Sequence, residues 1–300
     1  MIRIHIQYNM SINLRGTGVA LVTPFKNGYV DYDGLERLID HNINGGLEFL
    51  VTMGTTGESV TLSKKEKIAV MDFTIKTAAG RVGIVAGFGG YNTAEVKEQM
   101  QEYHFEGVDA ILSVSPAYNK PTQEGIYQHF MALAEVAPRP IILYNVPGRT
   151  ASNMEAETTL RLAKANEKFI AVKEASGNLR QCMEIIHGRP EGFLVLSGDD
   201  NITLPIIACG GDGVISVVGN AYPREFSDMT RAALAGDFRK AQALHYKLMH
   251  LVDLLFVEGN PGGIKANLEI LNICTAELRL PLAPISEKTY EALRIAASNI

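Results

Sequence analysis

The feature that most constrains the fold is a repeated alternation of short apolar runs and longer amphipathic stretches along the 300 residues. The apolar runs are rich in aliphatic and β-branched residues, which favours β-strands. They begin near Gly18, Leu47, Val82, Ala110, Ile141, Phe169, Phe193 and Gly213. The stretches between them repeat apolar residues at three and four positions, as amphipathic helices do, for example 34–44, 64–79, 93–105, 125–137 and 155–165.

Eight strand–helix units at roughly 20–35 residue intervals predict an α/β fold of the (β/α)8 barrel type, a TIM barrel. A doubly wound sheet is the structural alternative, although it usually needs fewer units. Two capping signals agree with the helix starts. Ser63 precedes one helix with Glu66 three positions on, and Asn92 precedes another.

The chain is expected to divide into three parts. Residues 16–235 hold the barrel and the catalytic groups, and residues 1–15 form an N-terminal extension in which Met10 is a possible alternative start. After the eighth strand, helices are predicted at 223–235, 237–256, 263–274 and 286–298. Residues 236–300 should therefore form a C-terminal helical subdomain, since no linker rich in Pro, Gly or Ser separates them from the barrel.

Composition narrows the class of protein. A net charge of −5 and a pI near 5.8 give no basic surface for nucleic acid, and no apolar stretch reaches the roughly 18 residues that span a bilayer. The three cysteines, Cys182, Cys209 and Cys274, have no metal-type spacing and cannot all be paired. These features are typical of a cytoplasmic protein with reduced thiols.

One lysine carries the strongest chemical signal. Lys173 is a lone cation at the end of the apolar run 169–173, where burial disfavours the ammonium form. A neutral amine in a pocket can attack a ketone and form a Schiff base. The alternative is a lysine that leaves the strand edge and extends into water.

Other polar clusters follow the apolar runs at equivalent places, where a barrel of this type carries its active site. Residues 54–59, Gly-Thr-Thr-Gly-Glu-Ser, could bind a small carboxylate through backbone N–H groups and hydroxyls. Tyr118 and Tyr144 lie in two further clusters, and Arg149 beside Gly and Pro could hold a carboxylate as a fixed fork.

Two kinds of residue receive no catalytic assignment. Asp199 and Asp200 could suggest a metal, but no third carboxylate or histidine stands near them, so a cap for the helix starting at Ile202 is favoured. The histidines fall on predicted helices, the termini or the opposite connecting side, and none is expected to be catalytic. They are His5, His41, His104, His129, His187, His245 and His250.

Several ordered segments together resemble one known family. They are 54–58 (Gly-Thr-Thr-Gly-Glu), 144–150 (Tyr-Asn-Val-Pro-Gly-Arg-Thr), 173–175 (Lys-Glu-Ala), 197–200 (Ser-Gly-Asp-Asp), 213–216 (Gly-Val-Ile-Ser) and 256–261 (Phe-Val-Glu-Gly-Asn-Pro) followed by Lys265. From about Gly16 onward, the chain resembles the pyruvate-dependent class I aldolases, a family that contains N-acetylneuraminate lyase. Within it, the resemblance is to the branch that condenses pyruvate with L-aspartate 4-semialdehyde.

The resemblance implies a role for each matched residue. Lys173 would form the imine with pyruvate, Tyr144 would be the acid and base, and Thr56 and Tyr118 would complete a hydroxyl relay. The remaining residues would serve substrate binding: Thr55 and Thr56 would hold the pyruvate carboxylate and Arg149 the semialdehyde carboxylate. Gly198 and Ile215 would contribute backbone carbonyls or shape to the pocket. The product would be 4-hydroxy-tetrahydrodipicolinate, on the route to lysine and diaminopimelate, and no metal or organic cofactor would be needed.

The resemblance also implies an assembly and a departure from regulated relatives. Tyr118 would enter a neighbouring subunit's site, so a homo-oligomer is expected, as a tetramer built from two dimers. Lysine-inhibited members bind lysine at positions matching Ser59, Lys64, Lys67, Tyr91, Glu95 and Ala117. Because Ala117 lacks a tyrosine hydroxyl and two lysines would repel a dibasic effector, weak feedback inhibition is expected. A sugar-acid aldolase and a non-catalytic pyruvate sensor remain as alternatives.

Overall fold

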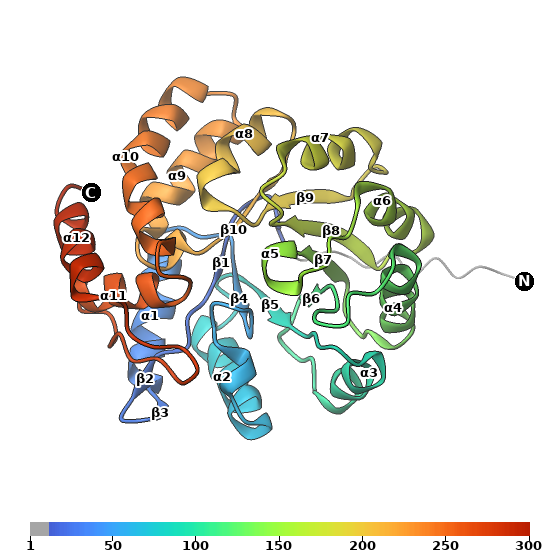
Figure 1. The fold of residues 1–300 in the computed structure, drawn as a ribbon, viewed down its shortest axis with the longest axis horizontal. Helices are drawn as coiled ribbons and strands as arrows, with labels where there is room; N and C mark the ends of the chain where they lie inside the picture. The colour runs from blue at the N-terminus through green and yellow to red at the C-terminus, as the bar shows by residue number, and fades with distance from the viewer. Residues whose placement is uncertain (1–11) are drawn as a thin grey trace, which may run out of the picture.

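Eight parallel strands close into a barrel in the computed structural model, which describes residues 12–300 (Figure 1). The strands are β1 (Gly16–Ala20), β4 (Phe49–Thr52), β5 (Gly83–Gly87), β6 (Ala110–Val114), β7 (Ile141–Asn145), β8 (Phe169–Glu174), β9 (Leu194–Ser197) and β10 (Gly213–Ser216). Each pairs with the next along the chain, and β1 pairs with both β4 and β10. The predicted barrel is therefore confirmed, and the doubly wound alternative is excluded.

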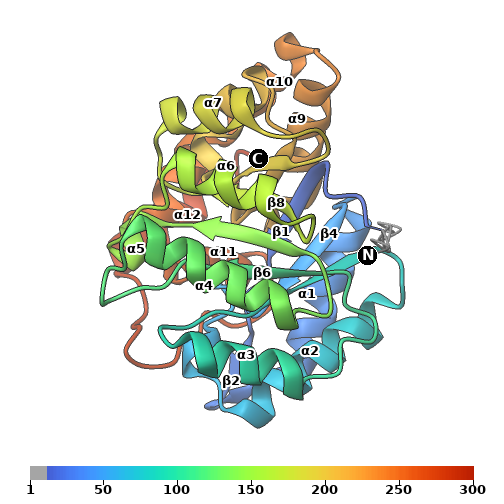
Figure 2. The same cartoon turned by 90° about the vertical axis from the view of Figure 1, so that its right-hand side faces the viewer.

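A helix follows each strand and covers the outside of the barrel (Figures 1 and 2). These helices are α1 (Tyr32–Asn44), α2 (Lys64–Ala78), α3 (Thr93–Glu102), α4 (Gln123–Val136), α6 (Ala156–Ala165), α7 (Leu179–Gly188), α8 (Thr203–Ala208) and α9 (Pro223–Leu234). A single turn, α5 (Pro147–Thr150), follows β7, and 3-10 turns η1 (Ser59–Thr61), η2 (Asp200–Ile202) and η3 (Val218–Asn220) follow β4, β9 and β10. A short hairpin of β2 (Phe25–Lys26) and β3 (Tyr29–Val30), which the sequence did not predict, precedes α1.

Both predicted capping signals are confirmed. Ser63 and Glu66 form a reciprocal capping box at the start of α2. Asn92 accepts a hydrogen bond from the N–H of Ala94 at the start of α3. Each bond pairs a helix-terminal N–H that has no partner within its own helix.

Strand alternation decides which side chains enter the barrel. Successive residues of a strand point to opposite faces, so Val172 packs outward under the helices, whereas Ala171 and Lys173 point inward. The parallel register then places Tyr144 of β7 directly beside Lys173 of β8. The two groups that the sequence singled out for imine chemistry are therefore neighbours at the carboxyl end of the barrel.

Three further helices follow the barrel: α10 (Phe238–Phe256), α11 (Gly262–Ile270) and α12 (Glu287–Ala297). Figure 1 shows them side by side at one flank, with α10 against α9. Helix α11 is shorter than expected because Asn272 adopts a left-handed conformation, with φ of 56°, that ends it. At the other end of the chain, Ile12 and Leu14 are buried in the apolar cluster inside the barrel, whereas Met10 lies outside the described residues.

Candidate active site

Lys173 is the centre of a small polar cavity at the carboxyl end of the barrel. Its side chain is 5 % exposed, and no described carboxylate lies within ion-pair distance of Nζ. The ammonium group lies over the ring of Tyr144, with Nζ 4.5 Å from the ring centroid. Since the amine makes no ion pair or hydrogen bond in residues 12–300, it is open to a bound electrophile.

The cavity of about 70 Å³ is built by both the barrel and the C-terminal segment. Its lining includes five of the predicted site residues, Thr55, Thr56, Tyr144, Arg149 and Gly198, together with Lys173. The other lining residues are Ala20, Gly54, Leu112, Val146, Ala175, Asp199, Val217, Phe256 and Asn260. The hydroxyl of Tyr144 has no hydrogen-bond partner among the described residues, so it too is available to a ligand.

The loop after β4 turns sharply over the mouth of the barrel. Its turns are closed by two internal bonds, from Gly57 N–H to the Gly54 carbonyl at 3.1 Å and from Glu58 N–H to the Thr55 carbonyl at 3.0 Å. The backbone N–H groups of Thr55 and Thr56 donate to no described group. Two free N–H groups beside two hydroxyls match the predicted arrangement for a small anion.

Gly198 leaves the space that the lysine side chain occupies. A Cβ at this position would lie 2.5 Å from Cβ of Ala175 and 3.1 Å from Cε of Lys173. Both distances are shorter than ordinary contacts, so a side chain here would clash with Ala175 and press on the end of the lysine side chain. The contribution of Gly198 to the pocket is thus its lack of a side chain.

Arg149 lies at the rim of the cavity and is held by the C-terminal segment. Its side chain is exposed, and its guanidinium donates to the carbonyl of Asn260 at 3.2 Å. Asn260 also donates through Nδ2 to Oγ1 of Thr56 at 2.9 Å. One asparagine therefore links the two parts of the site that were expected to bind the two carboxylates.

Two predicted site residues lie outside this cavity. Tyr118 is 87 % exposed, and its ring centroid is 6.5 Å from that of Tyr91, which is also exposed. Ile215 points into the barrel core, is fully buried and does not line the cavity. The side chain of Ile215 packs in the barrel core, and the ring of Tyr118 lies on the exposed surface of the chain.

The predicted helix cap at Asp199 and Asp200 is wrong. Neither side chain caps η2 or α8. Asp199 accepts from Gly177 N–H at 3.0 Å, and Asp200 accepts from the N–H groups of Val217 and Val218, each at 3.0 Å. The buried N–H groups of Val217 and Val218, just after β10, have no other described partner, so they take the Asp200 carboxylate. Asp200 thereby fixes the loop after β10 against the loop after β9.

Burial raises the pKa of both aspartate carboxyl groups. For Asp199 the hydrogen bond from Gly177 and the positive charge of Lys173 oppose this rise, and for Asp200 hydrogen bonds from Ser216 and the two valine N–H groups do so. Within residues 12–300, no three His, Cys, Asp or Glu side chains gather in a way that could hold a metal ion. The described helices include none that is long and apolar enough to cross a membrane.

Sequence reasoning assigned no role to the buried ion pair behind the threonine loop. Nζ of Lys265 lies 2.5 Å from Oε1 of Glu58, and both side chains are 0 % exposed. Burial lowers the pKa of Lys265, and the charge of Glu58 opposes this shift. The available signal was a lone lysine inside the apolar helix at 262–270, but a sequence does not show which carboxylate it meets.

Comparison with known proteins identifies the family. The family model described as "Dihydrodipicolinate synthetase family" matches residues 13–300. This chain belongs to the dihydrodipicolinate synthetase family. The resemblance seen in the sequence motifs is thereby confirmed at the level of the family.

Individual members are similar over nearly their whole length. A 4-hydroxy-tetrahydrodipicolinate synthase of Parabacteroides distasonis is 52 % identical over 94 % of this chain and 96 % of its own, and one of Flavobacterium psychrophilum is 53 % identical over 95 % and 98 %. The structure of the chloride-inhibited dihydrodipicolinate synthase of Acinetobacter baumannii in complex with pyruvate has a TM-score of 0.92. It is 39 % identical, covering 96 % of this chain and 99 % of that one.

Of the positions expected to match a lysine-binding site, Lys64, Tyr91 and Glu95 are exposed, whereas Ser59, Lys67 and Ala117 are half-buried. Lys64 is 69 % exposed and its Nζ lies 2.5 Å from Glu102, so a neighbouring carboxylate offsets its charge. Tyr91 is 67 % exposed, and Glu95 is also exposed. The repulsion expected from Lys64 is thereby reduced, whereas no described carboxylate forms an ion pair with Lys67. Lys67 and the missing hydroxyl at Ala117 thus stay the reasons to expect weak lysine inhibition.

Proposed function

We propose that this enzyme is a lyase that condenses pyruvate with L-aspartate 4-semialdehyde to give 4-hydroxy-tetrahydrodipicolinate. The observation that carries the proposal is the unpaired amine of Lys173 beside Tyr144, within a cavity that Thr55, Thr56 and Arg149 also line. Relatives of about half identity bear the name of that activity. The pathway implied is lysine and diaminopimelate biosynthesis.

The first half of the reaction needs a free amine and a proton carrier. The Lys173 amine attacks the ketone carbon of pyruvate, and the adduct loses one water to give an imine. Removal of a methyl proton then gives an enamine, with the protonated imine nitrogen accepting the electron pair. The Tyr144 hydroxyl, open to the cavity, is the group placed to move these protons. The lysine itself stabilises the carbanion, so the reaction requires neither metal nor organic cofactor.

The second half joins the two substrates. The enamine carbon attacks the aldehyde carbon of the semialdehyde and forms the new carbon–carbon bond, with the aldehyde oxygen taking a proton. The amino group of the semialdehyde then attacks the imine carbon, closes the ring and releases Lys173. One water is lost overall, in the step that forms the first imine.

The two carboxylates are expected to bind at different groups of the cavity lining. The free N–H groups of Thr55 and Thr56 suit the pyruvate carboxylate, which must lie close to Lys173. The exposed guanidinium of Arg149 suits the second substrate, which enters after the imine has formed. This order of binding is expected because Thr56 is buried in the cavity, whereas Arg149 is exposed at its rim.

The proposed assembly is a homotetramer built from two dimers. Tyr118 supports it, because an aromatic ring that is 87 % exposed is a poor surface residue and a suitable group to enter a neighbouring site. Sedimentation at assay concentration tests this proposal. An oligomer whose activity is lost on dissociation supports it, and a fully active monomer contradicts it. We also propose that the enzyme acts in the cytoplasm, as a step of lysine and diaminopimelate biosynthesis.

A substrate panel tests the activity directly. Purified enzyme with pyruvate should consume aspartate semialdehyde and give a product that a dihydrodipicolinate reductase reduces with a nicotinamide cofactor. N-acetylmannosamine in place of the semialdehyde is the matched control for the sugar-acid alternative. Turnover with the sugar and none with the semialdehyde would overturn the proposal. Binding of pyruvate without turnover of either aldehyde would favour the sensor.

A further inference from the structure

Glu174 follows the reactive lysine directly in β8 and points away from it. Because successive residues of a strand face opposite sides, Lys173 enters the cavity and Glu174 faces the surrounding helices, where it is 1 % exposed. The parallel register pairs Glu174 with Asn145, which follows Tyr144 in β7. The side chains of Glu174 and Asn145 thus lie immediately behind the two residues assigned to imine chemistry.

N–H donors surround the Glu174 carboxylate, and no cation does. Nδ2 of Asn145 donates to its two oxygens at 3.0 and 3.1 Å. The backbone N–H of Ser176 donates to Oε1 and Nε2 of Gln181 donates to Oε2, each at 2.9 Å. Within residues 12–300 no lysine, arginine or histidine forms an ion pair with it. Burial raises the pKa of this carboxyl group, and the hydrogen bonds from Ser176, Gln181 and Asn145 oppose the rise.

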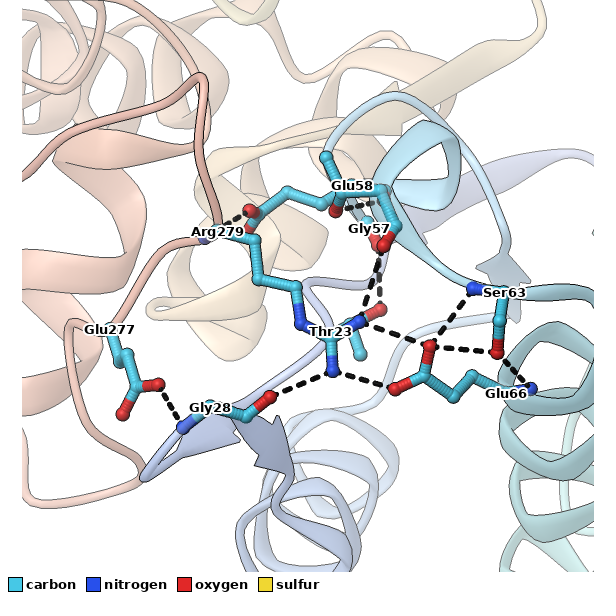
Figure 3. Close-up of polar contacts among 9 residues, drawn as sticks. Thr23, Gly28, Gly57, Glu58, Ser63, Glu66, Glu277 and Arg279 are labelled. Carbon is cyan, nitrogen blue, oxygen red and sulfur yellow. Dashed lines mark hydrogen bonds and ion pairs between the residues drawn. The ribbon is translucent and has the colours of Figure 1, made fainter.

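Glu58 is the only other buried glutamate among residues 12–300, and it is held differently. Its carboxylate lies 2.5 Å from Nζ of Lys265, and Figure 3 shows that it also accepts from the backbone N–H of Arg279. A cation therefore balances that buried charge. Glu174 has N–H donors alone, and a neutral glutamine of the same size would be less costly to bury. Its carboxylate is explained by geometry, because two oxygens accept from three residues at once, whereas a glutamine offers one oxygen.

The Asn145 side chain closes the loop that contains α5. Its Oδ1 accepts from the N–H of Met154 at 2.9 Å, so residues 146–153 leave and rejoin the barrel at one point. An amide carries its donors on the nitrogen and its acceptor on the oxygen. Because every contact of the Glu174 carboxylate is with a donor, it draws Nδ2 of Asn145 towards itself and leaves Oδ1 facing Met154. The carboxylate thereby sets the direction of the bond that closes the loop.

Gln181 of α7 extends the same arrangement. Its Nε2 donates to Glu174, which leaves Oε1 to accept from Nδ2 of Asn153 at 2.8 Å. Oδ1 of Asn153 in turn accepts from Nδ2 of Asn145 at 2.8 Å. The end of the loop is therefore fixed by two amides that the carboxylate orients.

A continuous set of hydrogen bonds connects the ends of the loop to Arg149. The N–H groups of Arg149 and Thr150 donate to the Val146 carbonyl at 2.9 and 3.0 Å. Oγ1 of Thr150 donates at 2.7 Å to the carbonyl of Ser152, the residue before Asn153. The base of the Arg149 side chain, which lines the cavity, therefore moves with the ends of the loop.

We propose that Glu174 is a positioning residue for the second substrate. Through Asn145 and Gln181 its carboxylate holds the loop that carries Arg149, so that the guanidinium stands at the cavity rim where the semialdehyde carboxylate binds. The proposal rests on the proposed function, which assigns that carboxylate to Arg149. Glu174 does not line the cavity and neither gains nor loses a proton in the reaction.

Glu174→Gln keeps the size of the side chain and removes one acceptor. Its amide N–H groups then face the donors of Asn145 or Gln181, so the loop loosens. KM for aspartate semialdehyde should rise about 10-fold, whereas KM for pyruvate and borohydride trapping on Lys173 should change less than about twofold. A direct effect of the glutamate charge on the imine would give the opposite pattern, with slower trapping and an unchanged KM for the semialdehyde.

A double-mutant cycle tests whether the effect passes through Arg149. In an Arg149→Ala background the guanidinium is absent, so adding Glu174→Gln should raise KM for the semialdehyde less than about twofold further. Three outcomes would each overturn the proposal: equal factors in both backgrounds, a larger effect on pyruvate than on the semialdehyde, or a wild-type KM for the semialdehyde in Glu174→Gln.

Gln181→Met decides the matter if Glu174→Gln does not fold. Methionine fills a similar volume in α7, leaves β8 unchanged and removes the amide that links Glu174 to Asn153. KM for the semialdehyde should rise at least about threefold while pyruvate trapping stays at the wild-type level. A Gln181→Met enzyme with wild-type KM for both substrates would contradict the proposal.

Hydrogen exchange tests the closure of the loop independently of the reaction. The N–H of Met154 should exchange about 10-fold faster in Glu174→Gln than in the wild type, because its acceptor is no longer oriented. If the wild type turns over pyruvate and the semialdehyde but the variants miss these expectations, the positioning proposal alone fails. If the wild type makes no product from the two substrates, the proposed function and the role of Glu174 in it fail together, while exchange at Met154 still shows whether Glu174 closes the loop.

Discussion

Removing one member of the buried Glu58–Lys265 pair should destabilise the protein strongly. Both side chains are 0 % exposed, and Lys265 also donates to the Glu277 carbonyl at 2.8 Å and lies 4.1 Å from the centre of the Phe25 ring. Lys265→Met keeps most of the aliphatic stem and removes the charge together with the hydrogen bond to the Glu277 carbonyl. The carboxylate of Glu58 is then left buried with one backbone donor, from Arg279.

The magnitude follows from that loss. Breaking a buried ion pair by removing one partner costs about 3–5 kcal/mol. A chain of 300 residues has an unfolding entropy of roughly 0.6 kcal/mol per degree, at about 2 cal/mol per degree for each residue. The melting temperature of Lys265→Met should therefore fall by about 5–8 °C in differential scanning calorimetry.

The chain offers a matched control with the same substitution and the same separation of charges. Lys64 lies 2.5 Å from Glu102, but the two side chains are 69 % and 45 % exposed. An exposed pair contributes little to stability because water and salt screen its charges, so Lys64→Met should shift the melting temperature by less than about 2 °C. Glu58→Gln combined with Lys265→Met should recover part of the loss, because no unpaired charge remains. Equal shifts for the two single methionine variants would refute the reasoning.

Three further outcomes are expected. Arg149→Ala should raise KM for aspartate semialdehyde about 10- to 100-fold while pyruvate trapping survives; lost trapping with normal semialdehyde kinetics would mean that the two carboxylate sites are reversed. L-lysine titrated into the assay should give half-inhibition only above about 1 mM, equivalent to about 4 kcal/mol of binding, and inhibition well below that concentration would show a working effector site. The Arg279 hydrogen bond holds the pKa of Glu66 at about 2, below the ordinary 4.5, so its contribution to stability is complete above pH 4.5 and is lost as the pH falls towards 2. The difference in melting temperature between wild type and Glu66→Gln should shrink between pH 6 and pH 3, and a constant difference would exclude this linkage.

The sequence predicts the barrel and the centre of the site because both depend on local patterns. Lys173 and Tyr144 each end an apolar run, and the alternation of a strand places both inside the barrel. Parallel pairing of consecutive strands then makes them neighbours. The Ser63 capping box is equally local and was predicted together with its helix.

The contacts that the sequence does not predict join residues far apart in the chain. Asn260 meets Thr56 across 204 positions, and no periodicity or local motif connects them. Asp200 carries a cap signal for its own helix, but buried N–H groups from the end of β10 take its carboxylate instead. In both cases the decisive partner is set by how the loops meet above the barrel, which only the folded structure reveals.

The central claim is that Lys173 forms the covalent intermediate, and borohydride reduction in the presence of pyruvate tests it most directly. Peptide mapping of the wild-type enzyme should place one reduced pyruvate adduct on Lys173. Lys173→Ala should show no adduct and almost no turnover, and Lys173→Arg should behave in the same way, because a guanidinium remains protonated and forms no imine. An adduct on any other residue of the wild type, or a pyruvate adduct that persists in Lys173→Ala, would contradict the claim.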